Sequence, residues 1–73
     1  MENRGSEEMR YLRRYKGENN WEEISREEMV EKLGRYYRNS EDIVSKMEKA
    51  VEYLAGGEYP IINTPWTYFR IEK

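Results

Sequence analysis

The stretch from Asn39 to Gly57, NSEDIVSKMEKAVEYLAGG, decides the fold. Its apolar residues recur at the spacing of one helical face; they are Ile43, Val44, Met47, Ala50, Val51, Leu54 and Ala55. Polar residues occupy the opposite face; they are Glu41, Ser45, Glu48, Lys49 and Glu52. Asn39 or Ser40 is placed to cap the helix, and the Gly56-Gly57 doublet to end it. The pattern predicts an amphipathic helix that must bury one face against the rest of the chain.

A second helix is predicted just before it. Ser25 and Glu28 form the capping-box pattern S-x-x-E, and Ile24 and Met29 are spaced as a hydrophobic staple. The predicted helix runs to about Arg38, so almost no linker is left and the two helices are expected to form a tight hairpin. Gly34 falls inside this helix, which indicates either a closely approaching backbone or simple tolerance of glycine.

The two ends of the chain are expected to pair as strands. Met9 to Lys16, MRYLRRYK, fits either a helix or an alternating strand, and the aromatic tail Trp66 to Lys73, WTYFRIEK, favours the strand because it needs a long partner. Pro60 limits Tyr59 to Asn63 to a short edge strand. We therefore predict an α+β fold in the order β-α-α-(β)-β, with two helices on a small antiparallel sheet. The alternative is a small all-α domain of three helices.

Length and composition set further bounds. Seventy-three residues make one small domain, which we assign to residues 9–73, with 1–8 as a flexible terminus. The chain has no cysteine and no histidine, which removes thiolate chemistry and the commonest metal ligand and general base. No apolar run is long enough for a membrane span, so a cytoplasmic protein is expected. Met9 to Gly17 carries four basic residues and no acidic one, although the whole chain has a net charge of −2.

The terminal strands suggest an aromatic and basic sheet face. Alternation places Tyr11, Arg13 and Tyr15 on one side of the first strand. On the last strand it groups Trp66, Tyr68 and Arg70, and leaves Leu12, Phe69 and Ile71 for the core. In a chain so poor in Leu and Ile, we favour core packing for Trp21, Trp66 and Tyr68, whereas Tyr11 and Tyr15 fit the core and a contact surface equally well.

Other groupings give no catalytic or ligand-binding pattern. The carboxylates Glu22, Glu23, Glu27 and Glu28 surround a helix N-terminus, where the dipole alone favours them, so we expect neither a metal site nor a cofactor. The Gly56-Gly57 doublet follows a helix, whereas a phosphate loop precedes one. The serines have no histidine to activate them. We therefore expect no enzymatic activity.

The abundant aromatic residues and the lack of a catalytic set favour a protein that functions by binding other molecules. We expect a non-enzymatic protein-binding module, an adaptor, regulator or inhibitor typical of phages or other mobile elements, which could form a homodimer. Its predicted partner-binding residues are Arg10, Tyr11, Arg13, Tyr15, Tyr53, Trp66, Tyr68 and Arg70. The alternative is a single-stranded nucleic-acid-binding protein that uses the basic and aromatic sheet face.

Overall fold

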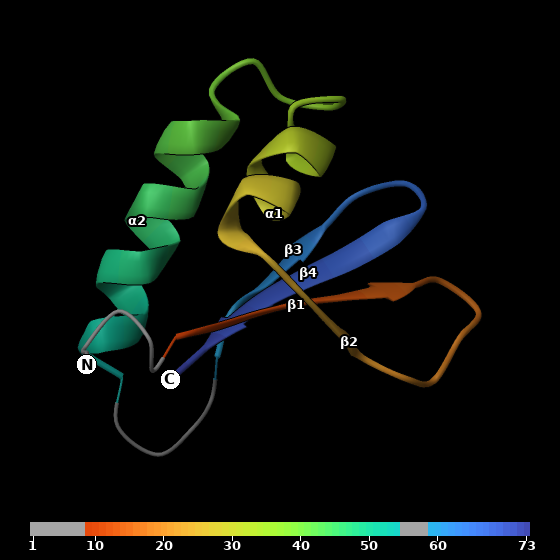
Figure 1. Cartoon of the computed structure of the whole chain (residues 1–73), viewed down its shortest axis with the longest axis horizontal. Helices are drawn as coiled ribbons and strands as arrows, with labels where there is room; N and C mark the ends of the chain where they lie inside the picture. The colour runs from red at the N-terminus through yellow and green to blue at the C-terminus, as the bar shows by residue number, and fades with distance from the viewer. Residues whose placement is uncertain (1–8, 55–58) are drawn as a thin grey trace.

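A computed structural model describes residues 9–54 and 59–73 of the chain. These ranges form four strands and two helices in the order β-β-α-α-β-β (Figure 1). Their bounds are β1 Arg10–Tyr15, β2 Glu22–Ile24, α1 Arg26–Leu33, α2 Ser40–Glu52, β3 Ile61–Asn63 and β4 Thr67–Glu72. The predicted α+β class is confirmed, and the three-helix alternative is wrong. The expected terminus 1–8 and the Gly56-Gly57 stop lie outside the described residues.

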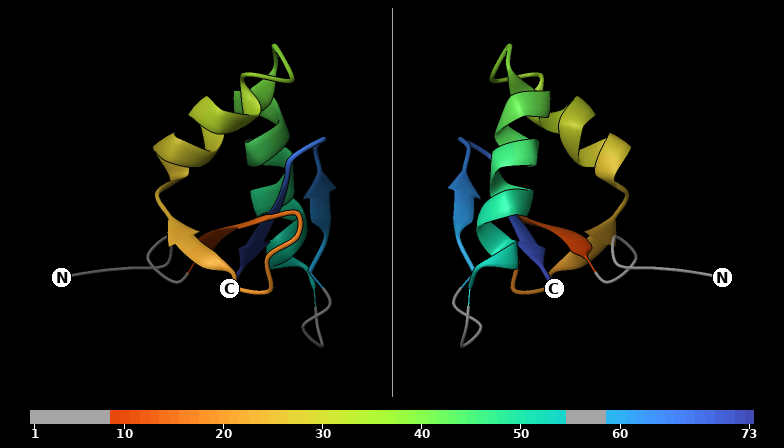
Figure 2. Two further views of the ribbon diagram at one scale, coloured as in Figure 1. Left: turned by 90° about the vertical axis from the view of Figure 1, so that its right-hand side faces the viewer. Right: turned by 90° about the vertical axis from the view of Figure 1, so that its left-hand side faces the viewer.

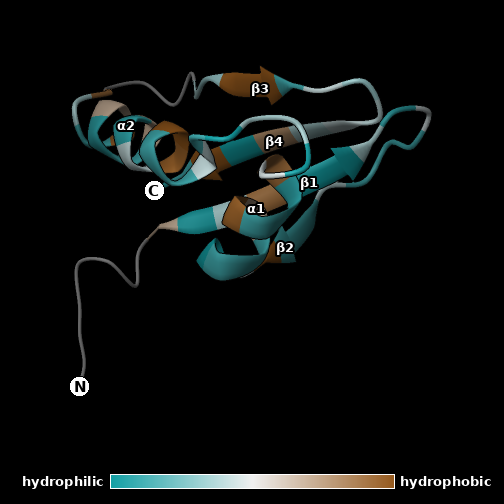
Figure 3. Cartoon of the chain, turned by 90° about the horizontal axis from the view of Figure 1, so that it is seen from above, coloured by the Kyte–Doolittle hydropathy of each residue, from teal (hydrophilic) through white to brown (hydrophobic). Residues whose placement is uncertain are grey.

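The strands form one antiparallel sheet in the order β2-β1-β4-β3. Figure 3 shows this order across the sheet, with both helices in front of it. The two terminal strands pair along their whole length, from Arg10 opposite Glu72 to Tyr15 opposite Thr67. This pairing confirms that the aromatic tail takes the N-terminal segment as its partner. β3 is the short edge strand that Pro60 predicted.

β2 is an additional strand that the sequence analysis did not predict. It forms a hairpin with β1 through a turn in which Gly17 has φ +92° and the Glu18 N–H donates to the Tyr15 carbonyl at 3.0 Å. A positive φ suits glycine, which has no Cβ to clash. The turn chemistry of Gly17 to Asn20 was visible in the sequence, but a three-residue strand with two glutamates gives almost no alternation to detect.

α1 begins where the capping box predicted and ends earlier than expected. The Ser25 hydroxyl accepts a hydrogen bond from the Glu28 N–H at 3.0 Å. The helix ends at Leu33, not near Arg38, and Gly34 is its C-cap. A Cβ on Gly34 would lie 3.3 Å from the Val30 and Glu31 carbonyl oxygens of α1 and 3.4 Å from the Ser40 hydroxyl at the start of α2. This glycine is therefore crowded by the last turn of its own helix and, at a slightly longer distance, by the side chain that begins the next helix.

The core lies between the two helices and one face of the sheet. Figure 2 shows α1 and α2 on the same side of the sheet in both views. The core side chains are Met29, Leu33, Val44, Val51, Phe69 and Ile71, each at most 1% exposed. Phe69 and Ile71 are the residues of β4 that the alternation assigned to the core. No helix or strand in the described ranges packs on the other face of the sheet.

Candidate partner-binding surface

The side of the sheet away from the helices is the candidate site, which we call the open sheet face. Alternate residues of β4 are buried against the helices, so Tyr68 and Arg70 point to the other side. The register places Arg14 opposite Tyr68, and Leu12 opposite Arg70. The members of the face that the register and contacts identify are Arg10, Leu12, Arg14, Lys16, Trp21, Glu23, Ile61, Asn63, Tyr68, Arg70 and Glu72.

Cationic and aromatic side chains stack on one another across this face. The guanidinium carbon of Arg70 lies 4.4 Å from the centroid of the Trp21 ring. That of Arg14 lies 4.8 Å from the Tyr68 ring and 5.3 Å from Trp21, and the Lys16 ammonium lies 5.1 Å from Tyr68. These distances are within the range of cation–π attraction, which fixes flexible cations beside planar rings. The face is thus an ordered layer of arginine, tryptophan and tyrosine.

Leu12 lies beneath this layer and not in the main core. It is 4% exposed, yet it belongs to the side of β1 that faces away from the helices. We attribute its burial to its long neighbours on the same face, because arginine can lay its methylene stem over apolar surface while its head stays in water. The open sheet face therefore has a small apolar centre of its own.

Positive charge on the face is compensated at one end only. Arg10 lies 3.9 Å from Glu23 and 3.6 Å from Glu72, and Arg70 also pairs with Glu72. Arg14 donates to the backbone carbonyl of Glu18. Among residues 9–54 and 59–73, neither Arg14 nor Lys16 makes an ion pair. The end of the face near the β1–β2 turn is consequently cationic.

The structure divides the predicted binding residues between the two faces. Tyr11, Arg13 and Tyr15 pair with Ile71, Phe69 and Thr67, so they point to the helix side. Their expected grouping with Tyr68 and Arg70 is wrong. Leu12 is buried as expected, but it lies on the open sheet face and not between the sheet and the helices. The register with β4 decides this, because shifting a strand by one residue exchanges its faces. Arg10 was not assigned a face, and it lies with Tyr68 and Arg70.

Two predicted aromatic residues lie outside the open sheet face or at its edge. Trp66 is 71% exposed, so core packing was the wrong expectation for it; its carbonyl accepts a hydrogen bond from the Lys16 N–H at 3.0 Å. Tyr53 is 86% exposed at the C-cap of α2, outside the apolar helical face as its position predicted. Trp21 and Tyr68, also expected in the core, are half-buried in the cation–π layer.

On the helix side, Arg13 lies over the Tyr15 ring at 4.3 Å and pairs with Glu22. These three residues line an open hollow of about 480 Å³ at the β1–β2 hairpin, together with Glu18, Asn20 and Trp21. The Arg13 Nε is buried without a hydrogen-bond partner in the described structure. Trp21 is shared between this hollow and the open sheet face, so a partner that covers the face would also meet the hairpin.

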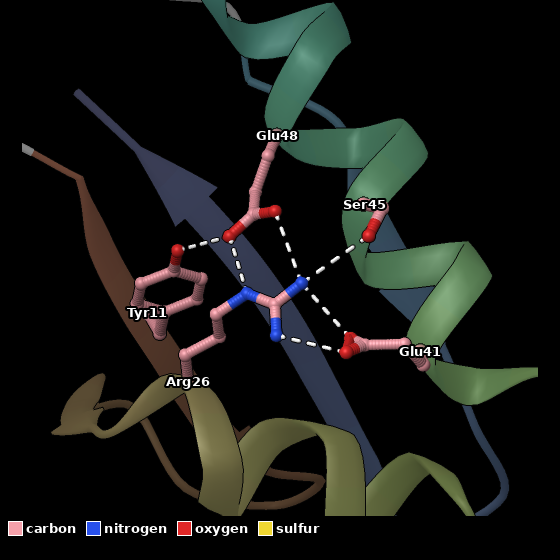
Figure 4. Close-up of polar contacts among 5 residues, drawn as sticks. All are labelled: Tyr11, Arg26, Glu41, Ser45 and Glu48. Atoms are coloured by element: carbon pink, nitrogen blue, oxygen red, sulfur yellow. Dashed lines mark hydrogen bonds and ion pairs between the residues drawn. The ribbon is translucent and has the colours of Figure 1, made fainter. Parts of the chain in front are cut away.

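A polar network that the sequence analysis missed joins α1, α2 and β1 (Figure 4). The Arg26 Nε donates to Glu48 at 2.8 Å, and its terminal nitrogens reach Glu41 at 2.9 Å and Ser45 at 3.2 Å. The Tyr11 hydroxyl donates to the same Glu48 carboxylate. Glu41, Ser45 and Glu48 recur at i, i+4 and i+7 on α2 and belong to the polar face opposite its apolar residues. Their polar stripe was the available signal, but nothing in the sequence identified Arg26 as its partner.

The network shifts the pKa values of its members. Burial of Tyr11 and its hydrogen bond to Glu48 raise the pKa of the phenol well above its usual value. Hydrogen bonds to Glu48 and Glu41 raise the pKa of Arg26 above its already high usual value. Burial alone would raise the pKa of Glu48, but the hydrogen bonds from Arg26 and Tyr11 outweigh it and lower the pKa. These groups keep fixed protonation states near neutral pH, so the network suits structural support and not proton transfer.

Within the described ranges, no group of three or more carboxylates could hold a metal ion. Neither described helix is long and apolar enough to cross a membrane. No family model, curated protein or solved structure matches the chain.

Proposed function

We propose that this chain is a non-enzymatic protein-binding module that contacts its partner through the open sheet face. The observation that carries the proposal is the cation–π layer of Arg14, Arg70, Trp21 and Tyr68 on a face that no described element covers. Tryptophan, tyrosine and arginine are the residues enriched at the energetic centres of protein interfaces. Ordering by the rings also lowers the entropy that the arginines lose when a partner binds.

The edges of the sheet are less suited to binding a partner than the open sheet face. β2 and β3, the two outer strands, each have three residues, and Pro60 and Pro65 flank β3. Short edge strands flanked by proline offer few backbone groups to an added strand. A partner bound mainly by side chains on the sheet face fits this architecture better than one bound by strand addition.

The proposed setting is the cytoplasm. There the module would act as an adaptor, regulator or inhibitor among the accessory proteins of a phage or another mobile element. A second copy of the chain is one partner that the face could accept. Light scattering of the purified protein tests this case, because a dimer made by the face should dissociate in the Arg70→Gln variant.

The experiment for a different partner is quantitative capture from a host lysate with matched variants. Arg70→Gln and Tyr68→Ala alter the open sheet face, whereas Arg35→Gln changes an exposed cation in the α1–α2 connection. Circular dichroism verifies that each variant is folded. We expect wild type and Arg35→Gln to retain the same partner, and both face variants to lose most of it. A partner that all four proteins capture equally would contradict the proposal.

The second candidate is single-stranded nucleic-acid binding. It is supported by the alternation of cations and aromatic rings on a four-stranded antiparallel sheet, a combination that can meet phosphates and bases together. Its affinity for a single-stranded oligonucleotide should fall steeply with added salt because counterions are released. Binding without that salt dependence would count against it.

A further inference from the structure

We propose that Arg14 and Lys16 form a carboxylate-binding pair, so that the partner of the open sheet face presents an acidic protein segment. This inference rests on the proposed function and names the chemistry of the partner. It concerns the end of the face nearest the β1–β2 turn, where the positive charge is not compensated within the described residues.

The first observation is the position of the two cations over one ring. The guanidinium carbon of Arg14 lies 4.8 Å from the centroid of the Tyr68 ring, and the Lys16 ammonium lies 5.1 Å from it. Two like charges held over the same ring repel each other. A carboxylate that binds both side chains would relieve the repulsion and accept charge-assisted hydrogen bonds from them. The shared ring thus keeps both cations near one position on the face, where an acidic side chain can meet them together.

The second observation is that this cationic region is confined to one end. Towards the opposite end, Glu23 and Glu72 pair with Arg10, and Glu72 pairs with Arg70 as well. A nucleic-acid strand carries a phosphate at every nucleotide and is bound along a continuous cationic groove. On this face such a strand would meet the two glutamates. A protein can instead place one or two carboxylates where the cations are.

The third observation concerns the rings themselves. The Trp21 ring has Arg70 at 4.4 Å, and the Tyr68 ring has both Arg14 and Lys16 close to it. Bases that stack on these rings would compete with the cations for the ring faces and weaken the cation–π attraction. A carboxylate binds the N–H edge of a guanidinium, which stacking leaves accessible; one terminal nitrogen of Arg14 donates to the Glu18 carbonyl, and its remaining N–H groups are the ones proposed to bind the carboxylate. The arrangement thus favours acidic side chains over bases.

Heteronuclear NMR titration of the labelled full-length protein tests the inference with two probes of equal charge, an oligoglutamate and an oligothymidylate. We expect the oligoglutamate to shift the signals of Arg14, Lys16, Tyr68 and the Trp21 indole, and to bind more tightly than the oligothymidylate. Arg14→Gln and Lys16→Gln should each weaken the affinity for the oligoglutamate by about three- to fivefold, as for the loss of one exposed ion pair. Lys49→Gln, on the exposed side of α2, is the matched control and should bind as wild type.

Two results would overturn the inference. The first is oligoglutamate binding that is undetectable or unaffected by both variants. The second is tighter binding of the oligothymidylate at the same residues, which would reassign the face to nucleic acid. The proposed function is tested separately by Arg70→Gln and Tyr68→Ala: if a captured protein depends on those residues and not on Arg14 or Lys16, the module binds protein and only the acidic chemistry is wrong.

Discussion

At the scale of single residues, Arg26 shows how one side chain can connect three elements of a small protein. A guanidinium has five donors in a fixed plane, and here they reach Glu48, Glu41 and Ser45 on α2. Glu48 also accepts from Tyr11 on β1. The side chain of Arg26 is 34% exposed, so solvent screens part of the attraction. The network therefore adds a modest stability and links α1 to α2 through several hydrogen bonds.

Glu48→Gln should lower the free energy of unfolding at neutral pH by about 1 kcal/mol, the size of a partly screened ion pair with its hydrogen bonds. The pKa of Glu48 is lower in the folded protein than its usual value of about 4.5. Its contribution is therefore complete above that value and is lost as the pH falls through the folded pKa. Urea unfolding of both proteins between neutral and acidic pH should show a difference that shrinks below about pH 4.5.

Glu52→Gln is the control for this measurement, since Glu52 is exposed on α2 and its carboxylate makes no ion pair among the described residues. It should leave stability almost unchanged at every pH. A Glu48→Gln difference that stays constant down to strongly acidic pH would show that the charge of Glu48 contributes nothing.

Leu12→Ala should destabilise the protein although Leu12 is not part of the main core. Leu12 is 4% exposed beneath the arginine and aromatic layer, and removal of a buried leucine side chain costs at least about 2 kcal/mol. We expect the lower end of that range because long flexible neighbours can partly fill the space. Ile61→Ala, on the same face and 50% exposed, is the comparison and should cost less than about 1 kcal/mol. Equal urea midpoints for the two variants would contradict the burial of Leu12.

At the scale of elements, the two helices differ in how their first turns are satisfied. The Ser25 hydroxyl accepts the Glu28 N–H at 3.0 Å, whereas Asn39, the N-cap of α2, makes no side-chain capping bond. Ser25→Ala should therefore cost about 1 kcal/mol, and Asn39→Ala less than about 0.5 kcal/mol. Thermal and urea unfolding monitored by circular dichroism measure both. A larger loss for Asn39→Ala would show that its side chain caps α2 in solution.

The β1–β2 hairpin depends on one backbone conformation. Gly17 has φ +92°, and a Cβ built there meets nothing within 4 Å. A substitution would therefore be unfavourable only because residues with a side chain rarely adopt this backbone conformation, and not because of a clash with a neighbour. Gly17→Ala should cost about 1 kcal/mol of unfolding free energy. Gly17→Asn should cost less because asparagine tolerates left-handed conformations better. If both variants were as stable as wild type, the turn would have to adopt another conformation in solution.

Across the whole protein, the sequence predicted the helices and strands that have strong periodicity. It did not predict features that depend on a neighbouring strand, such as which face of the sheet a side chain occupies. The apolar stripe of α2 and the aromatic tail β4 were sufficient to predict a helix and a strand. The faces of β1 could not be read from its own residues, since Leu12 and Tyr11 are both large and the register with β4 assigns their sides. β2 was missed because three residues carry too little pattern.

The sequence predicted which residue types form the candidate site, but not which individual residues belong to it. Arginine, tyrosine and tryptophan in the terminal segments indicated a contact surface, and Arg10, Tyr68 and Arg70 do lie on the open sheet face. Trp21 joins it only because β2 pairs with β1. The Arg26 network shows the same limit, as its members lie far apart in the sequence and meet only when α1 packs on α2.

The helices and strands of this protein share one hydrophobic core. A single core of this size supplies only about 3–5 kcal/mol, and the hairpin, α1 and the terminal strands all rest on it, so the chain should unfold in one transition. Tryptophan fluorescence reports mainly on the half-buried Trp21 at the sheet, because Trp66 is 71% exposed. Far-UV circular dichroism is dominated by the helices, and both signals should give the same urea midpoint. Ser25→Ala combined with Gly17→Ala should lower the unfolding free energy by about 2 kcal/mol, the sum of the single losses, because the two changes lie at different ends of the hairpin. A fluorescence midpoint clearly below the dichroism midpoint would show instead that the sheet loses its structure before the helices do.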